Sequence, residues 1–374
     1  MRGGPVPRAT VSPRDRIAPG DTLRAMSSAP LHRNPAWFGS VMATSALSIA
    51  FLQQSDYVGG ATFVAIADGL LVLATLLALG LAPLYLVRAR NRKALAAEIA
   101  DPAQGAMLAT FPAGILVYAS AWGTVGAGWL GTGIALTVCA ALLVIGAGLG
   151  IALSIAWASL QSGVQLDLVD VNGGWLIPVV MNLIAPLSIA PLIVAYPDQA
   201  TWLLMIGLAF YGVGTLLFLP MFALLVARLA LRPPVPNTMQ PTLWIPLAPA
   251  GLIGLALLRL MQAGADAGIL SEEAISLGVV VSAMGIGLGL WWSLYAAGRL
   301  IRVRRAGGLP FLPGWWGFVF PVAALSLSFG ALADQLASAP VDAASFVIFV
   351  CLVIAWAIVA WRSSAAVLRA LRPA

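Results

Sequence analysis

Residues 313–334 read PGWWGFVFPVAALSLSFGALAD, and no charged side chain interrupts this stretch before Asp334. An α-helix needs roughly 20 apolar residues to cross the hydrocarbon core of a bilayer, and the stretch has that length. It also carries Pro321 inside the apolar run, where a proline leaves a backbone carbonyl that must find protein or water beside it. The stretch therefore predicts a transmembrane helix that lies against other protein rather than against lipid.

Similar stretches recur along the whole chain of 374 residues, of which 61% are hydrophobic and only 9% charged. A soluble globular domain carries roughly 25% charged residues, so the composition excludes a soluble globule. The predicted fold class is all-α integral membrane, with one ten-helix domain at 34–369 and a basic cytosolic tail at 1–33 that lacks the apolar core of a signal peptide. The predicted spans are 34–54, 61–88, 103–123, 129–158, 174–195, 200–228, 239–262, 271–298, 313–334 and 341–361.

Lysine and arginine are distributed unevenly between the two sides of these spans. With both termini cytoplasmic, 19 of the 20 basic residues fall on the inner side, as the positive-inside rule requires. The exception is Arg259, placed at the outer end of the seventh span. The predicted location is the plasma or inner membrane, and the net charge of +6 reflects this topology. Nucleic acid is a poor alternative partner because the basic residues are not gathered into a groove with interleaved aromatics.

Prolines inside the odd-numbered spans indicate how the helices are arranged. Pro112, Pro186, Pro249 and Pro321 follow one another at spacings of 74, 63 and 72 residues, about one helical hairpin each. Since each such proline frees a carbonyl, the odd helices need protein or water around them. We therefore predict five repeated hairpins, with the odd helices inside and the even helices facing lipid. Small residues in the inner helices, such as Gly39, can widen a pore or allow close helix packing, and close packing is favoured for each one alone.

Three acidic residues are candidates for chemistry. Asp68 lies deep in the second predicted span, where a carboxylate hydrogen-bonded between helices is favoured over a proton carrier. Asp167 and Asp170 form a DxxD pattern in a cytosolic loop, which can hold Mg²⁺ in membrane-embedded transferases. Solvated loop carboxylates are favoured here, because no second acidic motif and no basic pyrophosphate clamp accompany the pair.

The cysteine and histidine content gives no support to redox or metal chemistry. Cys139 and Cys351 lie inside apolar stretches, and His32 precedes the first of them. These residues cannot build a disulfide framework or a Cys/His metal cluster. We predict no cofactor, no metal site and no enzymatic activity.

Four short motifs occur in order near the starts of odd spans. They are NPAWFG at 34–39, ATFP at 109–112, QPTL at 240–243 with Ala248-Pro249, and WWGFVFP at 315–321. Together, across about residues 34–362, they resemble the tellurite-resistance/dicarboxylate transporter family. That family includes TehA proteins, malic acid transporters, fungal sulfite pumps and plant slow anion channels.

The resemblance implies a fold of five hairpins around a pseudo-fivefold axis with a central pore, assembled as a homotrimer with one pore in each subunit. It also implies that a phenylalanine of the ninth helix plugs the pore. That position corresponds to Phe320, with Phe318 as the runner-up. The candidates for lining or bending the pore are Gly39, Phe111, Pro112, Pro186, Pro249 and Pro321.

The leading hypothesis is an anion channel or facilitator for small anions or C4-dicarboxylates such as malate. An apolar plug raises the barrier to a hydrated ion. No lysine or arginine is expected deep in the pore, which suits weak anion binding and fast conduction. The alternative is a proton-coupled C4-dicarboxylate carrier, or a sulfite or tellurite-type exporter, with Asp68 as the proton site. A Mg²⁺-dependent transferase at Asp167 and Asp170 is a third hypothesis.

Overall fold

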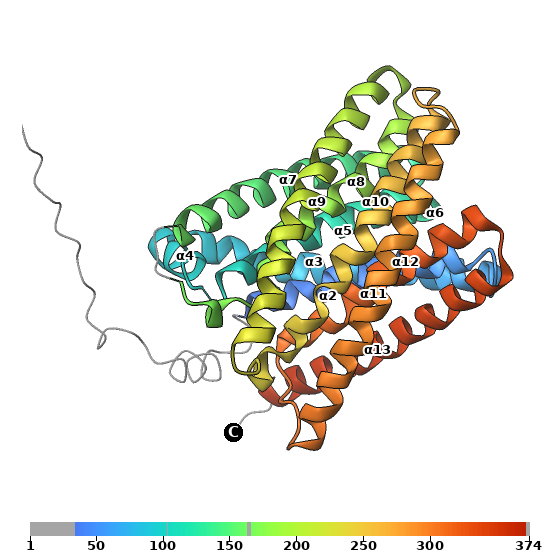
Figure 1. The fold of residues 1–374 in the computed structure, drawn as a ribbon. Coiled ribbons are helices and arrows are strands. Elements are labelled where there is room, and N and C mark those ends of the chain that lie inside the picture. The colour runs from blue at the N-terminus through green and yellow to red at the C-terminus, as the bar shows by residue number, and fades with distance from the viewer. Residues whose placement is uncertain (1–33, 103, 163–165, 372–374) are drawn as a thin grey trace, which may run out of the picture. The chain divides into compact units, whose positions relative to one another are not determined.

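The computed structural model describes residues 34–371 except 103 and 163–165, and Figure 1 shows that this part of the chain is built from helices. Within it, ten helices are long and apolar enough to cross a membrane. The predicted fold class is confirmed, and the protein is an integral membrane protein. The tail expected at 1–33 lies outside the described residues and stays a prediction.

Each odd-numbered span begins as a 3-10 segment and continues as an α-helix. The α-helical parts are short, between 15 and 20 residues. The pairs are η3 Pro35–Phe38 with α2 Gly39–Gln54, η4 Gly105–Ala109 with α5 Thr110–Thr124, η6 Gly173–Leu176 with α8 Ile177–Ala195, η8 Asn237–Trp244 with α10 Leu247–Asp266, and η9 Pro313–Phe318 with α12 Val319–Leu336.

Each even-numbered span is a single long α-helix of 30 to 33 residues. Two short helices that the sequence did not predict, α4 Arg92–Ile99 and α6 Gly126–Leu130, lie in the connections. The five long helices are α3 Gly60–Ala89, α7 Thr132–Gln161, α9 Ala200–Leu231, α11 Glu273–Arg305 and α13 Ala339–Leu371.

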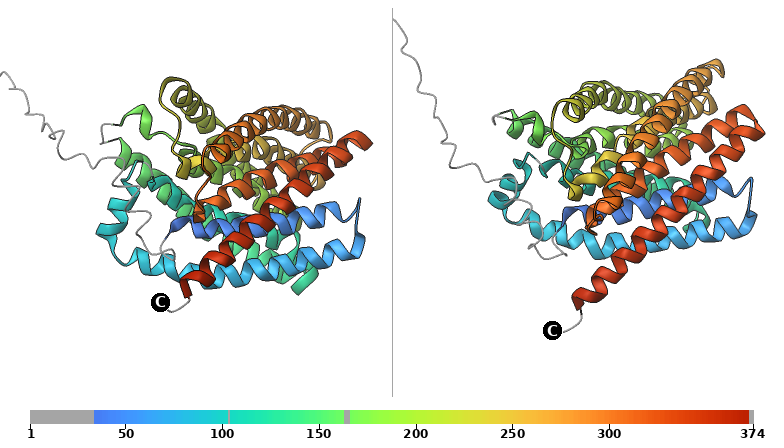
Figure 2. Two further views of the ribbon diagram at one scale, coloured as in Figure 1. Left: turned by 90° about the horizontal axis from the view of Figure 1, so that it is seen from below. Right: turned by 60° about the horizontal axis from the view of Figure 1, so that its bottom comes forward.

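The five odd helices form a closed ring. α2 packs on α5, α5 on α8, α8 on α10, α10 on α12, and α12 returns to α2. In Figure 2 the first hairpin, α2 and α3 in blue, accordingly lies beside the last, α12 and α13 in orange and red. In the most apolar 18-residue stretch of each odd span, between 78% and 94% of the residues are buried. In the even spans the buried share is 17% to 28%. The inner and outer assignment is therefore confirmed, whereas the pseudo-fivefold relation between hairpins stays a prediction.

The structure corrects the interpretation of the prolines. Pro112, Pro249 and Pro321 are each the third residue of an inner α-helix, and Pro178 is the second residue of α8. The first four N–H groups of an α-helix have no partner within it, so a proline there removes no hydrogen bond. Pro186 does lie inside α8. The repeating proline of the third hairpin is thus Pro178, which gives more even spacings of 66, 71 and 72 residues.

Two glycines explain how closely the inner elements approach. A Cβ atom added at Gly39 would lie 2.9 Å from the Cβ of Trp316, and one at Gly251 would lie 2.7 Å from the carbonyl oxygen of Ala324. These distances leave no room for a side chain without displacement of the neighbour. Gly39 therefore allows α2 to approach η9, a packing role, and its part in lining a pore stays a prediction.

Candidate functional site

A cavity of about 400 Å³ opens inside the ring, at the C-terminal ends of the inner helices. All five inner helices line it, for example through Gln53 of α2, Thr124 of α5, Pro191 of α8, Arg259 of α10 and Leu327 of α12. We call it the mouth cavity. Because every hairpin contributes to it, a solute in this cavity would be enclosed by the ring and not by a single helix pair.

Arg259 places a positive charge inside the mouth cavity. Its half-buried side chain lies seven residues before the end of α10 at Asp266, about 10 Å inward at 1.5 Å per residue. Nη1 donates a hydrogen bond to Oε1 of Gln262 at 3.1 Å. Among the residues that the structure describes, no carboxylate lies within the 4.0 Å of an ion pair with this guanidinium.

This position corrects the sequence analysis, which expected no basic side chain at depth. The seventh span was predicted to end at 262, so that Arg259 fell at its outer end, whereas α10 continues to Asp266. Arg259 was visible in the sequence as the one basic residue on the outer side. Its exceptional position singled Arg259 out, but the predicted helix end at 262 placed it near the membrane surface and not inside the span.

Three carboxylates surround the entrance of the mouth cavity. Asp56, Asp266 and Asp334 are exposed and line it together with Arg259. The hydroxyl of Tyr57 donates to Oδ1 of Asp334. Partial burial, with this hydrogen bond and the nearby carboxylates, raises the pKa of Tyr57, so its phenol stays protonated and remains a donor. The cavity thus combines one cation within and an acidic rim.

Polar groups other than Arg259 also reach the cavity wall. Gln53 donates from Nε2 to the carbonyl oxygen of Leu327 at 3.2 Å, and its buried Oε1 has no hydrogen-bond partner among the described residues. The hydroxyls of Ser120 and Ser188 lie 2.8 Å apart, and Ser188 also donates to the carbonyl oxygen of Leu116 at 3.0 Å. Gln53 is therefore a wall residue whose amide oxygen has spare hydrogen-bonding capacity.

Phe320 lies on the far side of an apolar segment from the mouth cavity. It is the second residue of α12 and is buried, with 5% of its surface exposed. Leu327, which lines the cavity, is seven residues further along the same helix, about 10 Å away along the axis. The residues between them are buried. Buried residues of α12 thus lie between the cavity and the level of Phe320.

Phe318 and Phe111 have aromatic partners. Phe318 is half-buried in η9, and its ring meets Trp244 edge-on at 5.7 Å and Trp315 at 5.8 Å between centroids. Phe111 stacks on Tyr85 of the outer helix α3 at 4.3 Å, with an interplanar angle of 8°. Phe318 thus packs on rings of η8 and η9, and Phe111 packs on a ring near the end of α3. The pore-lining role of Phe111 stays a prediction.

Asp68 faces an outer connection of the fold. It is half-buried on α3, and its Oδ1 would lie 3.4 Å from a Cβ atom added at Gly128 of α6. It does not line the mouth cavity. The structure therefore does not bring Asp68 together with Arg259 or with the other residues of the cavity wall.

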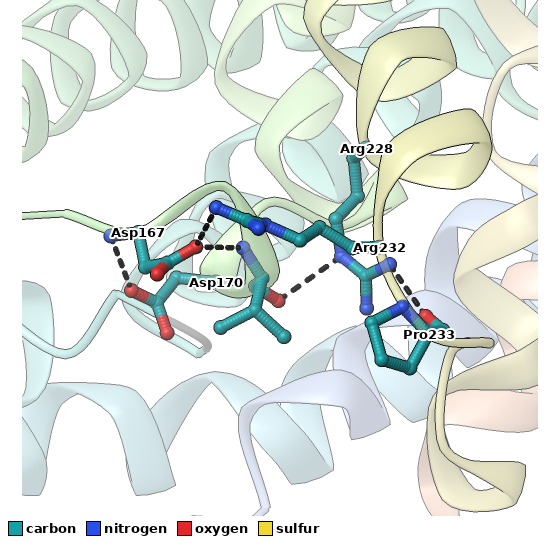
Figure 3. Close-up of polar contacts among 6 residues, drawn as sticks. Asp167, Asp170, Arg228, Arg232 and Pro233 are labelled. Atoms are coloured by element: carbon teal, nitrogen blue, oxygen red, sulfur yellow. Dashed lines mark hydrogen bonds and ion pairs between the residues drawn. The ribbon is translucent and has the colours of Figure 1, made fainter.

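Asp167 and Asp170 cap a 3-10 turn in the connection between α7 and α8, shown in Figure 3. Oδ2 of Asp170 accepts the N–H of Asp167 at 3.0 Å, and Oδ1 of Asp167 accepts the N–H of Val169 at 3.1 Å. Asp167 also forms an ion pair with Arg232 at 3.1 Å. The Val169 N–H, with Arg232 beside it, holds the pKa of Asp167 below its ordinary value. These contacts give both carboxylates a structural role.

Arg228 completes this cluster from the end of α9. It is 2% exposed, and it donates from Nε to the carbonyl oxygen of Val169 at 3.2 Å and from Nη1 to that of Pro233 at 2.7 Å (Figure 3). The connection after α7 is thereby tied to the end of α9. In the part of the chain that the structure describes, no three His, Cys, Asp or Glu side chains are placed to share a metal ion.

The known proteins that this chain resembles are channels and transporters. The family model SLAC1, described as voltage-dependent anion channel, matches residues 32–363. An uncharacterized transporter of Methanocaldococcus jannaschii is 29% identical over 78% of this chain and 80% of its own length, and a second is 31% identical over 43% and 46%. The sulfite efflux pump SSU1 of Arthroderma otae is 23% identical over 77% of this chain and 78% of its own length.

Proposed function

Because the chain belongs to the SLAC1 family of voltage-dependent anion channels, we propose that it is an anion channel or facilitator that conducts through the ring of inner helices. One observation carries the proposal: a cavity lined by all five inner helices holds Arg259, a basic side chain inside a spanning segment. A guanidinium attracts anions and repels cations, so Arg259 favours anions over cations inside the cavity, past its acidic rim.

Phe320 is the proposed gate. Its burial in the segment beyond the mouth cavity supports this role, because an apolar side chain across a narrow passage excludes water and stops a hydrated ion. Movement of the ring to another staggered rotamer would clear the passage without a rearrangement of helices. Phe318, with its two tryptophan neighbours, is the less suitable gate.

The charge distribution supports an orientation. With 19 of 20 basic residues on one side, the N- and C-termini lie in the cytoplasm of a plasma or inner membrane. The mouth cavity then opens to the outside, and the basic loops raise the anion concentration at the inner entrance. Each subunit of a homotrimer would carry its own pore.

Small inorganic anions and C4-dicarboxylates such as malate are the proposed substrates. Sulfite joins them because one relative is named a sulfite efflux pump. The same name favours a second candidate function, a coupled exporter of sulfite or a related anion. In that case transport would be driven by protons, and Asp68 would be the residue to carry them.

Current measurements across planar bilayers test the gate. Purified wild type, Phe320→Ala and Phe318→Ala are compared under a chloride gradient and then a malate gradient. We expect large currents with Phe320→Ala, with reversal potentials that follow the anion gradient, and Phe318→Ala near wild type. Equal small currents from all three proteins, with proton-driven uptake in liposomes, would instead support the coupled exporter.

A further inference from the structure

We propose that Arg259 is a binding site in the mouth cavity for planar oxyanions that carry a single negative charge, such as carboxylates or nitrate. The inference deepens the proposed function and rests on it, since the bound ion would be the one that permeates. It assigns a residue and a ligand class to the cavity, where the family match gives neither.

The contacts of two arginines in spanning helices distinguish a binding site from a structural side chain. Arg228 is 2% exposed and directs Nε and Nη1 to two backbone carbonyls. Arg259 donates to one protein acceptor, the amide oxygen of Gln262, and its other N–H groups have none among the described residues. A charged side chain within a bilayer span normally pairs with protein or serves a permeating solute. Arg259 fits the second case.

The shape of the donor group indicates the ligand. A guanidinium presents parallel N–H groups that match two oxygens of one anion. Nη1 donates to Gln262, and the remaining donors of Arg259, which lines the cavity, have no protein acceptor among the described residues. Thr124 lines the same cavity, but its hydroxyl donates to the backbone carbonyl of Ser120 at 2.9 Å, which leaves Arg259 as the donor for an anion. Planar oxyanions therefore gain paired hydrogen bonds that a spherical halide does not.

The acidic rim limits the charge of the ligand. Asp56, Asp266 and Asp334 line the cavity with Arg259, so three carboxylates stand against one guanidinium. A second negative charge on the ligand meets repulsion that a single cation does not offset. Monoanions should therefore bind more tightly than dianions such as fully ionised malate.

Ligand-dependent thermal unfolding of the purified protein tests binding without transport. Nitrate, acetate and malate are titrated at constant ionic strength and pH 7.5 against wild type, Arg259→Gln and the matched control Arg304→Gln, which removes an exposed arginine at the other end of the fold. We expect saturable increases in Tm with nitrate and acetate for wild type and Arg304→Gln, and an apparent affinity at least about tenfold weaker for Arg259→Gln. Unchanged affinity in Arg259→Gln, or malate binding more tightly than acetate, would overturn the site.

Permeability measurements separate failure of the site from failure of the channel. On the Phe320→Ala background, Arg259→Gln should lower the permeability ratio of nitrate to chloride severalfold, and Arg304→Gln should not. If Phe320→Ala passes no current while Arg259→Gln abolishes the Tm response, the site stands and the channel proposal fails. If current flows with the same ratio in Arg259→Gln and the Tm response persists, the channel stands and the site is overturned.

Discussion

Asp68 and Arg259 are both ionisable side chains inside spanning helices, but their surroundings differ. Arg259 belongs to the inner ring and lines the mouth cavity. Asp68 belongs to the outer helix α3 and lies close to Gly128 in the short helix α6. Both are unusual in an apolar environment, yet only the position of Arg259 allows direct contact with a solute inside the ring.

Neutralising Asp68 should therefore leave transport intact. We expect Asp68→Asn to show wild-type anion flux into liposomes, with and without an imposed proton gradient, because the side chain lies away from the cavity. The matched control is Asp198→Asn, which removes an exposed carboxylate in the turn before α9. Loss of proton-driven accumulation in Asp68→Asn alone would favour the coupled carrier over the channel.

Gly285 on α11 provides a test of packing between the inner and outer helices. A Cβ atom there would lie 2.2 Å from the carbonyl oxygen of Ala250 on α10, whereas one at Gly287 meets nothing within 4 Å. We expect Gly285→Ala to destabilise the protein by about 1–3 kcal/mol through overpacking. Gly287→Ala should be neutral or slightly stabilising, since alanine is the better helix former. Thermal unfolding in one detergent compares the two, and equal Tm values would contradict the α10–α11 contact.

At the scale of elements, apolar length predicted every span but not where the helices end. α10 continues past the predicted end at 262 to Asp266, because backbone hydrogen bonds continue where hydropathy falls. The 3-10 entries were also missed. Proline spacing alone did not identify Pro178, rather than Pro186, as the first-turn proline of the third hairpin, since sequence does not say at which turn a helix becomes α-helical. The depth of Arg259 was misjudged because the end of its helix was placed four residues too early.

The connection capped by Asp167 should respond to acid. Its pKa is lowered in the folded protein, so its contribution to stability is present above the unfolded value of about 3.9 and is lost as pH falls through the lower, folded value. Asp167→Asn should therefore unfold at a lower temperature than wild type at pH 7, and the difference should disappear in strong acid. The exposed ion pair with Arg232 limits the effect to a small one.

A matched variant separates the ion pair from the turn. Arg232→Gln removes the ion pair but keeps the hydrogen bond from the Val169 N–H to Asp167. It should lose less stability than Asp167→Asn at pH 7, because the N–H of Val169 has the largest effect on the carboxylate. A pH-independent difference between Asp167→Asn and wild type would show that ionisation of this carboxylate does not stabilise the fold.

At the scale of the whole molecule, the sequence predicted the inner and outer layers but not the cavity. The proline pattern and the resemblance together indicated which helices lie inside, and the burial of the odd spans agrees. The closure of the ring depends on contacts such as that between Gln53 and Leu327, which are 274 residues apart. No periodicity within a span reveals such a pair. The grouping of Arg259 with the rim carboxylates likewise appears only when the first and last hairpins meet.

The direction in which the mouth cavity opens can be tested on the intact membrane. The positive-inside distribution places the turn with Asp198 outside and the exposed Arg304 at the end of α11 inside. We expect a membrane-impermeant maleimide to label Asp198→Cys in intact cells and to label Arg304→Cys only after permeabilisation. Wild type, which contains the buried Cys139 and the exposed Cys351 within the spanning helix α13, gives the background labelling. The reverse pattern would show that the mouth cavity, with Arg259 and its acidic rim, faces the cytoplasm. Anions leaving the cell would then pass Arg259 before they reach the level of Phe320, and not after it.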